Sequence, residues 1–242
     1  MRLVSYQRKQ IQLKFILVKE LFKKIIPAWL LKWYRNRPRS AAKIFTETYN
    51  RNLWGSAESI SGTGSEFNQT KTLIKDLEKL LAELNIKTVL DIPCGDFNWM
   101  QKVDLSKIVY TGADIVKKLI RKNGIENKDK SNLKFVVLNL IKDPLPMCDM
   151  IITRDCLVHL SYADIFTALK NIQSSGCKYL LTTTFTDHRI NSDIITGGWR
   201  TINLQEEPFN LPPPILVINE NCTEWDGAYK DKSMALWEIS KI

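Results

Sequence analysis

The spacing of hydrophobic positions along the chain predicts a series of short buried strands. Each run is short, apolar and rich in Val, Ile or Thr, and polar or turn-forming residues separate the runs. They predict strands at residues 87–92, 108–114, 134–138, 148–153, 177–185, 215–219 and 234–240. The last two runs follow a proline-rich loop, so we expect them to add to one edge of the sheet.

Apolar residues at three- and four-residue steps predict helices between these strands. The clearest pattern follows Ser65 and marks a helix of about five turns that reaches residue 84. Further helices are expected at 97–103, 115–122 and 161–175, the last opened by a Ser and an Asp in capping-box-like spacing. Alternating strands and helices predict an α/β fold, with helices on both faces of a mostly parallel sheet.

Charge separates an N-terminal segment from the rest of the chain. The net charge is +9, yet residues 1–40 hold eleven Lys or Arg against Glu20 alone, so residues 41–242 are close to neutral. We therefore divide the chain into a basic arm at 1–40 and a globular domain at 41–242. The near-neutral domain disfavours nucleic acid as a partner, because phosphate binding would spread Lys and Arg around the cleft.

The arm itself has the pattern of an amphipathic helix. Apolar residues from Ile11 to Trp33 recur at helical spacing, with a bend expected at Pro27. The uncharged run 25–31 is too short to span a bilayer, and lysines interrupt every candidate signal-peptide core. Such a helix suits an anionic membrane surface or a second copy of the chain, although packing on the domain is the commoner use. We expect a cytoplasmic protein, with the arm as a candidate peripheral anchor on the inner face of the membrane.

Cysteine usage points to reducing surroundings. The five cysteines are odd in number and scattered, and no C-x-x-C pair occurs. This pattern favours free thiols in a cytosol over a disulfide framework or a zinc site.

Two carboxylates flank a tight turn in "VLDIPCGDFNWM", residues 89–100. Asp91 lies near the end of the first strand, Gly95 lets the turn approach a ligand closely, and Asp96 follows. Asp114 ends the next strand, where an acid typically accepts hydrogen bonds from ribose hydroxyls. The turn lacks the glycines of the dinucleotide fingerprint, so the acids suit a cationic, hydroxyl-bearing nucleoside such as S-adenosylmethionine. The alternative is that Asp91 caps the turn and Asp114 caps a helix.

Four motifs carry a family resemblance. In order, "VLDIPCGDFNWM", "YTGADIV", "FVVLNL" and "CDMIITRDCLVHLS" resemble the cofactor motifs of class I S-adenosylmethionine-dependent methyltransferases. The stretches "NLWGSAESISGTGS" and "TGGWRTINLQEEPFNLPPP" resemble a bacterial subgroup associated with surface-polysaccharide (capsule or lipopolysaccharide) genes and sugar O-methylation. The resemblance covers roughly residues 44–240 and implies a Rossmann-like, seven-stranded methyltransferase domain. The chain departs from the pattern at Pro93-Cys94 and at Asn139, where an Asp often stands.

The resemblance also implies which residues hold the cofactor. Residues 62–65 would cover it from above. The others implied are Asp91, Gly95 and Asp96 near the methionine part, Asp114 and Ile115 at the ribose and adenine, Asn139 and Leu140 at the adenine edge, and Arg154 after the fourth strand.

Methyl transfer to a hydroxyl benefits from a base, and the segment after the fourth strand offers one. "TRDCLVHLS" places Asp155 and His159 on the rim where an acceptor would enter. Because an imidazole titrates near neutral pH, His159 is the candidate base, oriented by Asp155 if the stretch turns helically. The alternative is that Asp155 caps a turn and His159 is an ordinary histidine near the surface.

A second rim segment offers groups that suit a sugar or sugar phosphate: a ring for stacking, a fork donor and an amide. The candidates for acceptor binding are Trp199, Arg200, Asn203 and His188. A plain glycine-rich surface loop is the alternative. A divalent-metal site of Asp155 with residues 187–188 is a further alternative, but we expect no metal, since sequence supplies no ligand geometry.

The sequence thus predicts an S-adenosylmethionine-dependent O-methyltransferase. Its expected partner is a sugar hydroxyl of a bacterial surface glycan or of a nucleotide-activated precursor, and the sugar rests mainly on the resemblance. An RNA or small-molecule methyltransferase and a non-catalytic cofactor-binding scaffold are the alternatives. A DNA amino-methyltransferase is disfavoured, because its Asn/Asp-Pro-Pro-aromatic motif should stand where this chain has Thr153-Arg154-Asp155.

Overall fold

A computed structural model describes residues 39–242. The expected amphipathic helix of the arm and its bend at Pro27 lie outside these residues. None of the helices described between residues 39 and 242 has the length and apolar content that crossing a bilayer requires.

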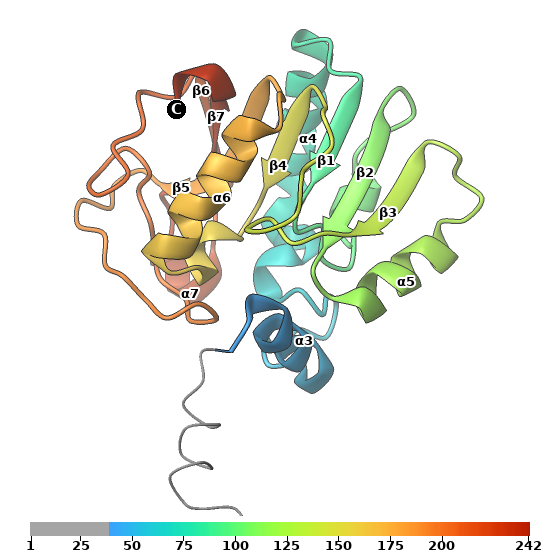
Figure 1. Cartoon of the computed structure of the whole chain (residues 1–242), viewed down its shortest axis with the longest axis horizontal. Helices are drawn as coiled ribbons and strands as arrows, with labels where there is room; N and C mark the ends of the chain where they lie inside the picture. Colours follow the sequence, from blue (N-terminus) through green and yellow to red (C-terminus); the bar gives the residue numbers. More distant parts are fainter. Residues whose placement is uncertain (1–38) are drawn as a thin grey trace, which may run out of the picture. The chain divides into compact units, whose positions relative to one another are not determined.

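A seven-stranded sheet forms the centre of the domain (Figure 1). Its spatial order is β3-β2-β1-β4-β5-β7-β6, parallel except for β7, which runs antiparallel to both of its neighbours. The strands are β1 (Thr88–Asp91), β2 (Val109–Asp114), β3 (Leu133–Val137), β4 (Met150–Thr153), β5 (Tyr179–Phe185), β6 (Leu216–Asn219) and β7 (Lys232–Glu238). The predicted strands are all present, and the last two close one edge as expected.

Helices cover both faces of the sheet because neighbouring strand residues point to opposite sides. On one face α4 (Phe67–Glu83) packs its leucines against Val89 and Ile152. On the other face α6 (Tyr162–Ser174) packs against Leu90 and Ile151 (Figure 1). The predicted fold class, a mostly parallel α/β sheet with helices on both sides, is confirmed.

At the start of α6, Ser161 accepts a hydrogen bond from the backbone N–H of Asp164, which confirms the expected cap of this helix.

The remaining helices are shorter than α4 and α6. The other helices are α3 (Ala41–Arg51), α5 (Lys117–Glu126) and α7 (Glu224–Gly227), with short 3-10 turns at η1 (Thr63–Ser65), η2 (Met100–Lys102), η3 (Leu157–His159) and η4 (Ile239–Lys241).

One helix prediction needs correction, and one helix was not predicted. The helix expected at 97–103 is reduced to the 3-10 turn η2, because Phe97 takes a left-handed φ of 62° that an α-helix cannot accommodate. Buried Phe97, Trp99 and Met100 instead fill the core on the α4 face. Helix α3 was not predicted, although Ala41, Phe45 and Tyr49 recur at four-residue steps.

Candidate functional site

A cavity of about 480 Å³ opens at the carboxyl ends of the parallel strands. Its walls come from the ends of β1, β2, β4 and β5, from one face of α3, from residues 60–65 and from α7. Parallel α/β sheets bind ligands at this edge, where neighbouring strand ends leave a crevice between their connections. The sheet therefore places the chain's principal cavity, among the described residues, at the end where the sequence predicted a site.

Asp91 ends β1 at the floor of this cavity. The residue is 2% exposed, and its carboxylate accepts a 2.6 Å hydrogen bond from the hydroxyl of Tyr110 on the neighbouring strand. Burial raises the pKa of Asp91 to about 7, with a further rise from the charge of Asp114, against the lowering effect of the Tyr110 bond. A ligand that brings a cation to this floor would favour the ionised carboxylate.

Asp114 ends β2, beside Asp91 and also in the cavity wall. The residue is 5% exposed, and its carboxylate accepts a 2.8 Å hydrogen bond from the backbone N–H of Val116. Burial raises the pKa of Asp114 to about 6. The alternative, that Asp114 caps a helix, is not what the structure shows: the bond to Val116 lies in the turn before α5, whose N-cap receives no side-chain bond, and the residue lines the cavity.

Gly95 and Asp96 fasten the first turn to an overlying loop. Gly95 has a φ of 54°, and a Cβ there would lie 2.3 Å from the hydroxyl oxygen of Ser61. The carboxylate of Asp96 accepts hydrogen bonds from the hydroxyls of Ser59 and Ser61 and from the backbone N–H of Ile60. Asp96 lines the cavity as predicted, but its acceptor capacity is directed mainly to the loop.

The adenine-side residues predicted from the resemblance also gather in the wall. Ile115, Asn139 and Leu140 all line the cavity, between the ends of β2 and β3 and the segment that follows β3. The side-chain oxygen of Asn139 accepts a 2.9 Å hydrogen bond from the backbone N–H of Ile141. This bond fixes the orientation of the amide and uses one lone pair of its oxygen.

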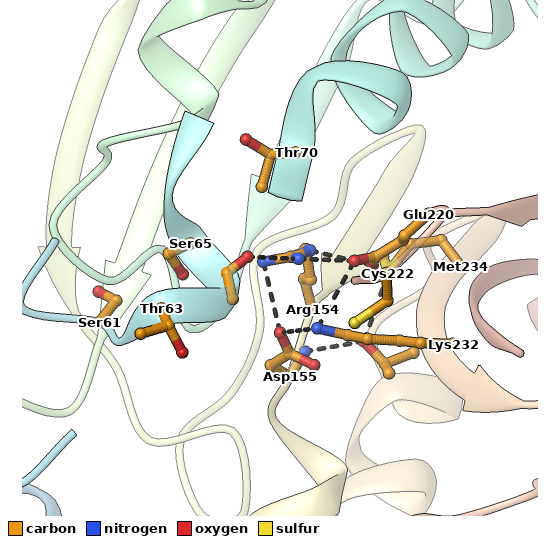
Figure 2. Close-up of polar contacts among 12 residues, drawn as sticks. Ser61, Thr63, Ser65, Thr70, Arg154, Asp155, Glu220, Cys222, Lys232 and Met234 are labelled. Atoms are coloured by element: carbon orange, nitrogen blue, oxygen red, sulfur yellow. Dashed lines mark hydrogen bonds and ion pairs between the residues drawn. The ribbon is translucent and has the colours of Figure 1, made fainter. Parts of the chain in front are cut away.

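A buried charge cluster joins the segments that follow β4 and β6 to the start of β7 (Figure 2). Arg154 forms a fork with Glu220 through bonds of 3.0 and 2.6 Å, and it donates a 2.8 Å bond to the carbonyl oxygen of Gly64. Lys232 lies 2.7 Å from Oδ2 of Asp155 and 3.5 Å from Glu220. Burial alone would raise the pKa of Asp155, but Lys232 and Arg154 outweigh it and lower this pKa to about 2.

The loop over the cavity is held by this cluster as well as by Asp96. Residues 62–65 line the cavity, as the resemblance implied, and η1 supplies most of them. The Thr63 hydroxyl donates to Glu224 of α7, and the Gly64 carbonyl oxygen accepts from Arg154. Arg154 therefore lies in the cavity wall after β4, but its guanidinium supports residues 62–65 by donating to the backbone carbonyl oxygen of Gly64.

His159 faces the cavity from the 3-10 turn η3. Its Nδ1 lies 2.7 Å from the carbonyl oxygen of Gly198, so Nδ1 carries the hydrogen and Nε2 is left as the basic nitrogen. The ring also packs 5.6 Å from that of Trp54. Burial lowers the pKa of His159 below its ordinary value, which favours the neutral imidazole at pH 7.

The expected orientation of His159 by Asp155 needs correction. Asp155 takes a left-handed φ of 50° and lies outside the turn that carries His159. Its Oδ2 pairs with Lys232 and Arg154, and Gly198 holds the imidazole instead. Asp155 and His159 still line the same cavity.

The predicted acceptor-binding residues separate into two groups. Trp199 lines the cavity, is 46% exposed and packs edge-on to Tyr229 at 5.0 Å. Arg200 is outside the wall, because its buried guanidinium donates to the backbone carbonyl oxygens of Leu157, Leu160 and Ser192.

Asn203 and His188 also lie away from the cavity wall. The buried Asn203 amide donates to the carbonyl oxygen of His188, and the His188 ring contacts the hydroxyl of Thr201. Arg200, Asn203 and His188 thus organise the loop that presents Trp199. Among residues 39–242, no group of three or more His, Cys, Asp or Glu side chains is placed to hold a metal ion.

Several residues of the site were not identified from the sequence. Lys232 and Glu220 come from the antiparallel edge of the sheet, far from β4 in the chain, and no local motif marks them. Trp54 and Tyr229 add aromatic walls. Only Trp54 lay within a motif already noted, "NLWGSAESISGTGS".

Comparison with known proteins identifies solved structures that share the fold of this chain. No family model matches the chain, and no curated protein matches it. Human N-acetylserotonin methyltransferase in complex with S-adenosylmethionine is similar in structure, with a TM-score of 0.55 and 13% identity over 83% of this chain and 60% of that chain. Similarity at this level establishes the Rossmann-like fold of class I methyltransferases.

Two further solved structures are similar over smaller parts of the chain. The magnesium protoporphyrin IX methyltransferase of Synechocystis PCC 6803 with bound S-adenosylmethionine has a TM-score of 0.47 and 13% identity, over 66% of this chain and 81% of that one. The methyltransferase domain of a bacterial Hen1 protein has a TM-score of 0.43 and 15% identity, over 48% of this chain and 66% of that one. The chain thus spans about two-thirds of the latter domain.

Proposed function

We propose that this chain is an S-adenosylmethionine-dependent methyltransferase. The observation that carries the proposal is the pair Asp91 and Asp114, which end adjacent parallel strands, are buried, and line one cavity. An amino group and a ribose diol are the ligand groups that such a pair accepts. The same fold in a human methyltransferase structure that contains S-adenosylmethionine supports this assignment.

The rest of the wall fits the same cofactor. Apolar side chains of Ile115, Leu138 and Leu140 offer a surface for a flat base near Asn139. The close approach of Gly95 to Ser61 keeps the first turn free of side-chain bulk. When bound, S-adenosylmethionine supplies an electrophilic methyl group on a cationic sulfur, so the protein's main task is to position the acceptor.

Binding of S-adenosylhomocysteine tests the cofactor proposal. We expect it to raise the unfolding midpoint, with about 2.7 kcal/mol of stabilisation at a hundredfold excess over Kd. Asp114→Asn should abolish most of the rise, whereas Asp129→Asn, at an exposed loop position, should keep it. Each variant is compared with its own ligand-free midpoint. The absence of a shift in the unmodified protein at millimolar ligand would contradict the proposal.

We propose further that the methyl group goes to a hydroxyl oxygen of a saccharide. His159 supports this choice, because a neutral imidazole with Nε2 available can take the proton of a hydroxyl as it attacks. The aromatic rings of Trp54, Trp199 and Tyr229 around the cavity suit the apolar faces of a sugar. The resemblance of the flanking motifs to polysaccharide-associated methyltransferases points the same way.

The charges in the wall favour an uncharged glycan over a nucleotide-activated sugar. Among the described residues, the only Lys or Arg in the wall are Arg154 and Lys232, and both are paired with Asp155 or Glu220. A phosphate would therefore meet carboxylates without an unpaired cation to balance it.

Transfer of labelled methyl groups tests this choice of acceptor. We expect transfer from S-adenosylmethionine to a neutral oligosaccharide and much less to the same sugar as its nucleoside diphosphate. If cofactor binding is confirmed while RNA is methylated and saccharides are not, the cofactor proposal stands and the saccharide proposal fails.

A further inference from the structure

We propose that Cys148 and Cys177 form a redox-active dithiol that hydrogen peroxide converts into an intramolecular disulfide. The two thiols lie just before β4 and β5, at the amino ends of these strands and away from the cavity. The proposal does not rest on the methyltransferase assignment, because neither cysteine lines that site.

The sheet register brings the two cysteines opposite each other. Met150 of β4 pairs with Tyr179 of β5 in a parallel ladder, and each cysteine lies two residues before its paired neighbour. Both side chains therefore point to the same side, on backbones about 4.8 Å apart, the usual spacing of paired strands. Disulfides bridge Cα atoms about 4.4–6.8 Å apart. The sulfur atoms lie 3.2 Å from each other, so little movement separates the dithiol from a bond.

The surroundings distinguish the roles of the two thiols. The backbone N–H of Cys148 donates to Sγ of Cys177 at 3.1 Å, and the Cys148 thiol is positioned to donate to the same sulfur. The thiol hydrogen bond from Cys148 lowers the pKa of Cys177, and the same bond raises the pKa of Cys148. The Pro146 carbonyl oxygen, 3.5 Å from Sγ of Cys177, opposes the lowering of this pKa, because it accepts a hydrogen bond from the protonated thiol. On balance Cys177 is the nucleophile and Cys148 the resolving thiol.

The limited exposure of the two thiols to solvent favours a small oxidant. Cys177 is buried, whereas Cys148 is partly exposed and follows Met147, whose side chain is largely exposed. Hydrogen peroxide is small enough to approach such a pair, and the remaining three cysteines have raised pKa values that keep them protonated.

The oxidation balances in two steps. The Cys177 thiolate attacks one peroxide oxygen, the O–O bond breaks, and hydroxide leaves to give a sulfenic acid. The Cys148 sulfur then attacks the Cys177 sulfur, the S–O bond breaks, and the second hydroxide leaves. The two departing hydroxides take up the two thiol protons as water. In total the two thiols lose two electrons to one peroxide.

Peptide mapping of the full-length protein after peroxide treatment tests the proposal. We expect the free thiols to fall from five to three and a non-reducing digest to link tryptic peptides 143–154 and 171–178. Dithiothreitol should restore both thiols. The unfolding midpoint should rise on oxidation, because the bond closes a loop between cysteines 29 positions apart.

Single variants separate this pair from general thiol oxidation. In Cys148→Ser, peroxide should leave a sulfenic acid on Cys177 that dimedone traps. In Cys177→Ser, dimedone should trap little sulfenic acid at Cys148. Cys222→Ser, a buried thiol elsewhere, should keep the linked peptides. The proposal is overturned if peroxide gives no link between these peptides, or if Cys148 alone reacts as fast as Cys177 alone.

Discussion

Lys232 and Asp155 are 77 positions apart in the chain, yet Nζ of the lysine lies 2.7 Å from Oδ2 of the aspartate (Figure 2). The pair joins the start of β7 to the carboxyl end of β4. Both groups are largely withdrawn from water, with Glu220 as a second carboxylate 3.5 Å from Nζ. The antiparallel strand β7 is thereby tied to the wall of the cavity.

Replacing Lys232 by Met should destabilise the fold strongly. The substitution keeps the approximate length of the side chain but removes the cation nearest Asp155, so that Arg154 alone remains to balance both carboxylates. We expect a loss of up to about 3–5 kcal/mol, the cost of removing one partner from a buried pair. Urea unfolding measures the loss. Lys230→Met, at an exposed position two residues away, should change stability by less than about 0.5 kcal/mol. Equal effects of the two substitutions would show that the pair contributes little.

Asp91 and Asp114 should lower the stability of the ligand-free domain as the pH rises from about 4 to above 7, against an opposite contribution near neutral pH from His159, whose pKa is lowered by burial. The pKa values of Asp91 and Asp114 are raised to about 7 and about 6, from a value of 3.8 without the fold, so the folded state binds more protons across this range. Their contribution is fully present below about pH 4 and is lost as pH rises through the folded pKa values.

Urea unfolding at pH 5 and pH 8 checks this dependence. Asp91→Asn should reduce the difference between the two pH values, and Asp129→Asn should leave it unchanged. A difference of the same size in Asp91→Asn would mean that Asp91 titrates at its ordinary pKa.

Gly95→Ala should distort the first turn and weaken cofactor binding. The added Cβ would lie 2.3 Å from the Ser61 hydroxyl oxygen, and the φ of 54° disfavours any residue with a Cβ. We expect a loss of about 1–3 kcal/mol in unfolding free energy, together with at least tenfold weaker S-adenosylhomocysteine binding by calorimetry.

Gly124→Ala in α5 provides the control for this prediction. A Cβ at Gly124 meets no atom within 4 Å, so alanine should stabilise the helix by about 0.5–1 kcal/mol. Unchanged ligand affinity in Gly95→Ala would indicate that the turn can shift away from Ser61 without cost.

Under the proposed O-methyl transfer, His159→Ala should lower kcat by about 10²–10⁴-fold, the usual contribution of a general base. Binding of S-adenosylhomocysteine should change little. In the unmodified protein kcat should fall on the acid side, with a midpoint below the ordinary histidine pKa, because burial lowers the pKa of His159. A pH profile that keeps this acid limb in His159→Ala would assign the limb to another group.

Local sequence patterns predicted the strands, and most residues expected to hold the cofactor line one cavity, although their role stays a prediction. Asp91 and Asp114 stand at strand ends whose position follows from short apolar runs, and parallel pairing brings those ends together. Features that depend on distant contacts were not predictable in this way. Phe97 adopts a left-handed conformation, and Arg200 turns inward to backbone carbonyl oxygens that approach only in the folded chain.

The charge cluster illustrates the same limit. Asp155 was expected to orient His159 from a spacing of four residues, an argument that treats the segment as an isolated helix. In the fold, Lys232 from the antiparallel strand β7 forms an ion pair with the Asp155 carboxylate. Long-range pairing of this kind leaves no local spacing in the sequence.

The position of β7 constrains the order in which the chain can assemble during synthesis. Of the seven strands, β7 is made last, yet it lies inside the sheet, between β5 and β6. While the earlier strands leave the ribosome, β5 therefore presents an unpaired edge, and Asp155 and Glu220 lack their lysine. The parallel half can collapse first, but the cavity wall is completed only when β7 inserts. Until β7 inserts, the unpaired edge of β5 is a place where another chain could pair with the nascent domain.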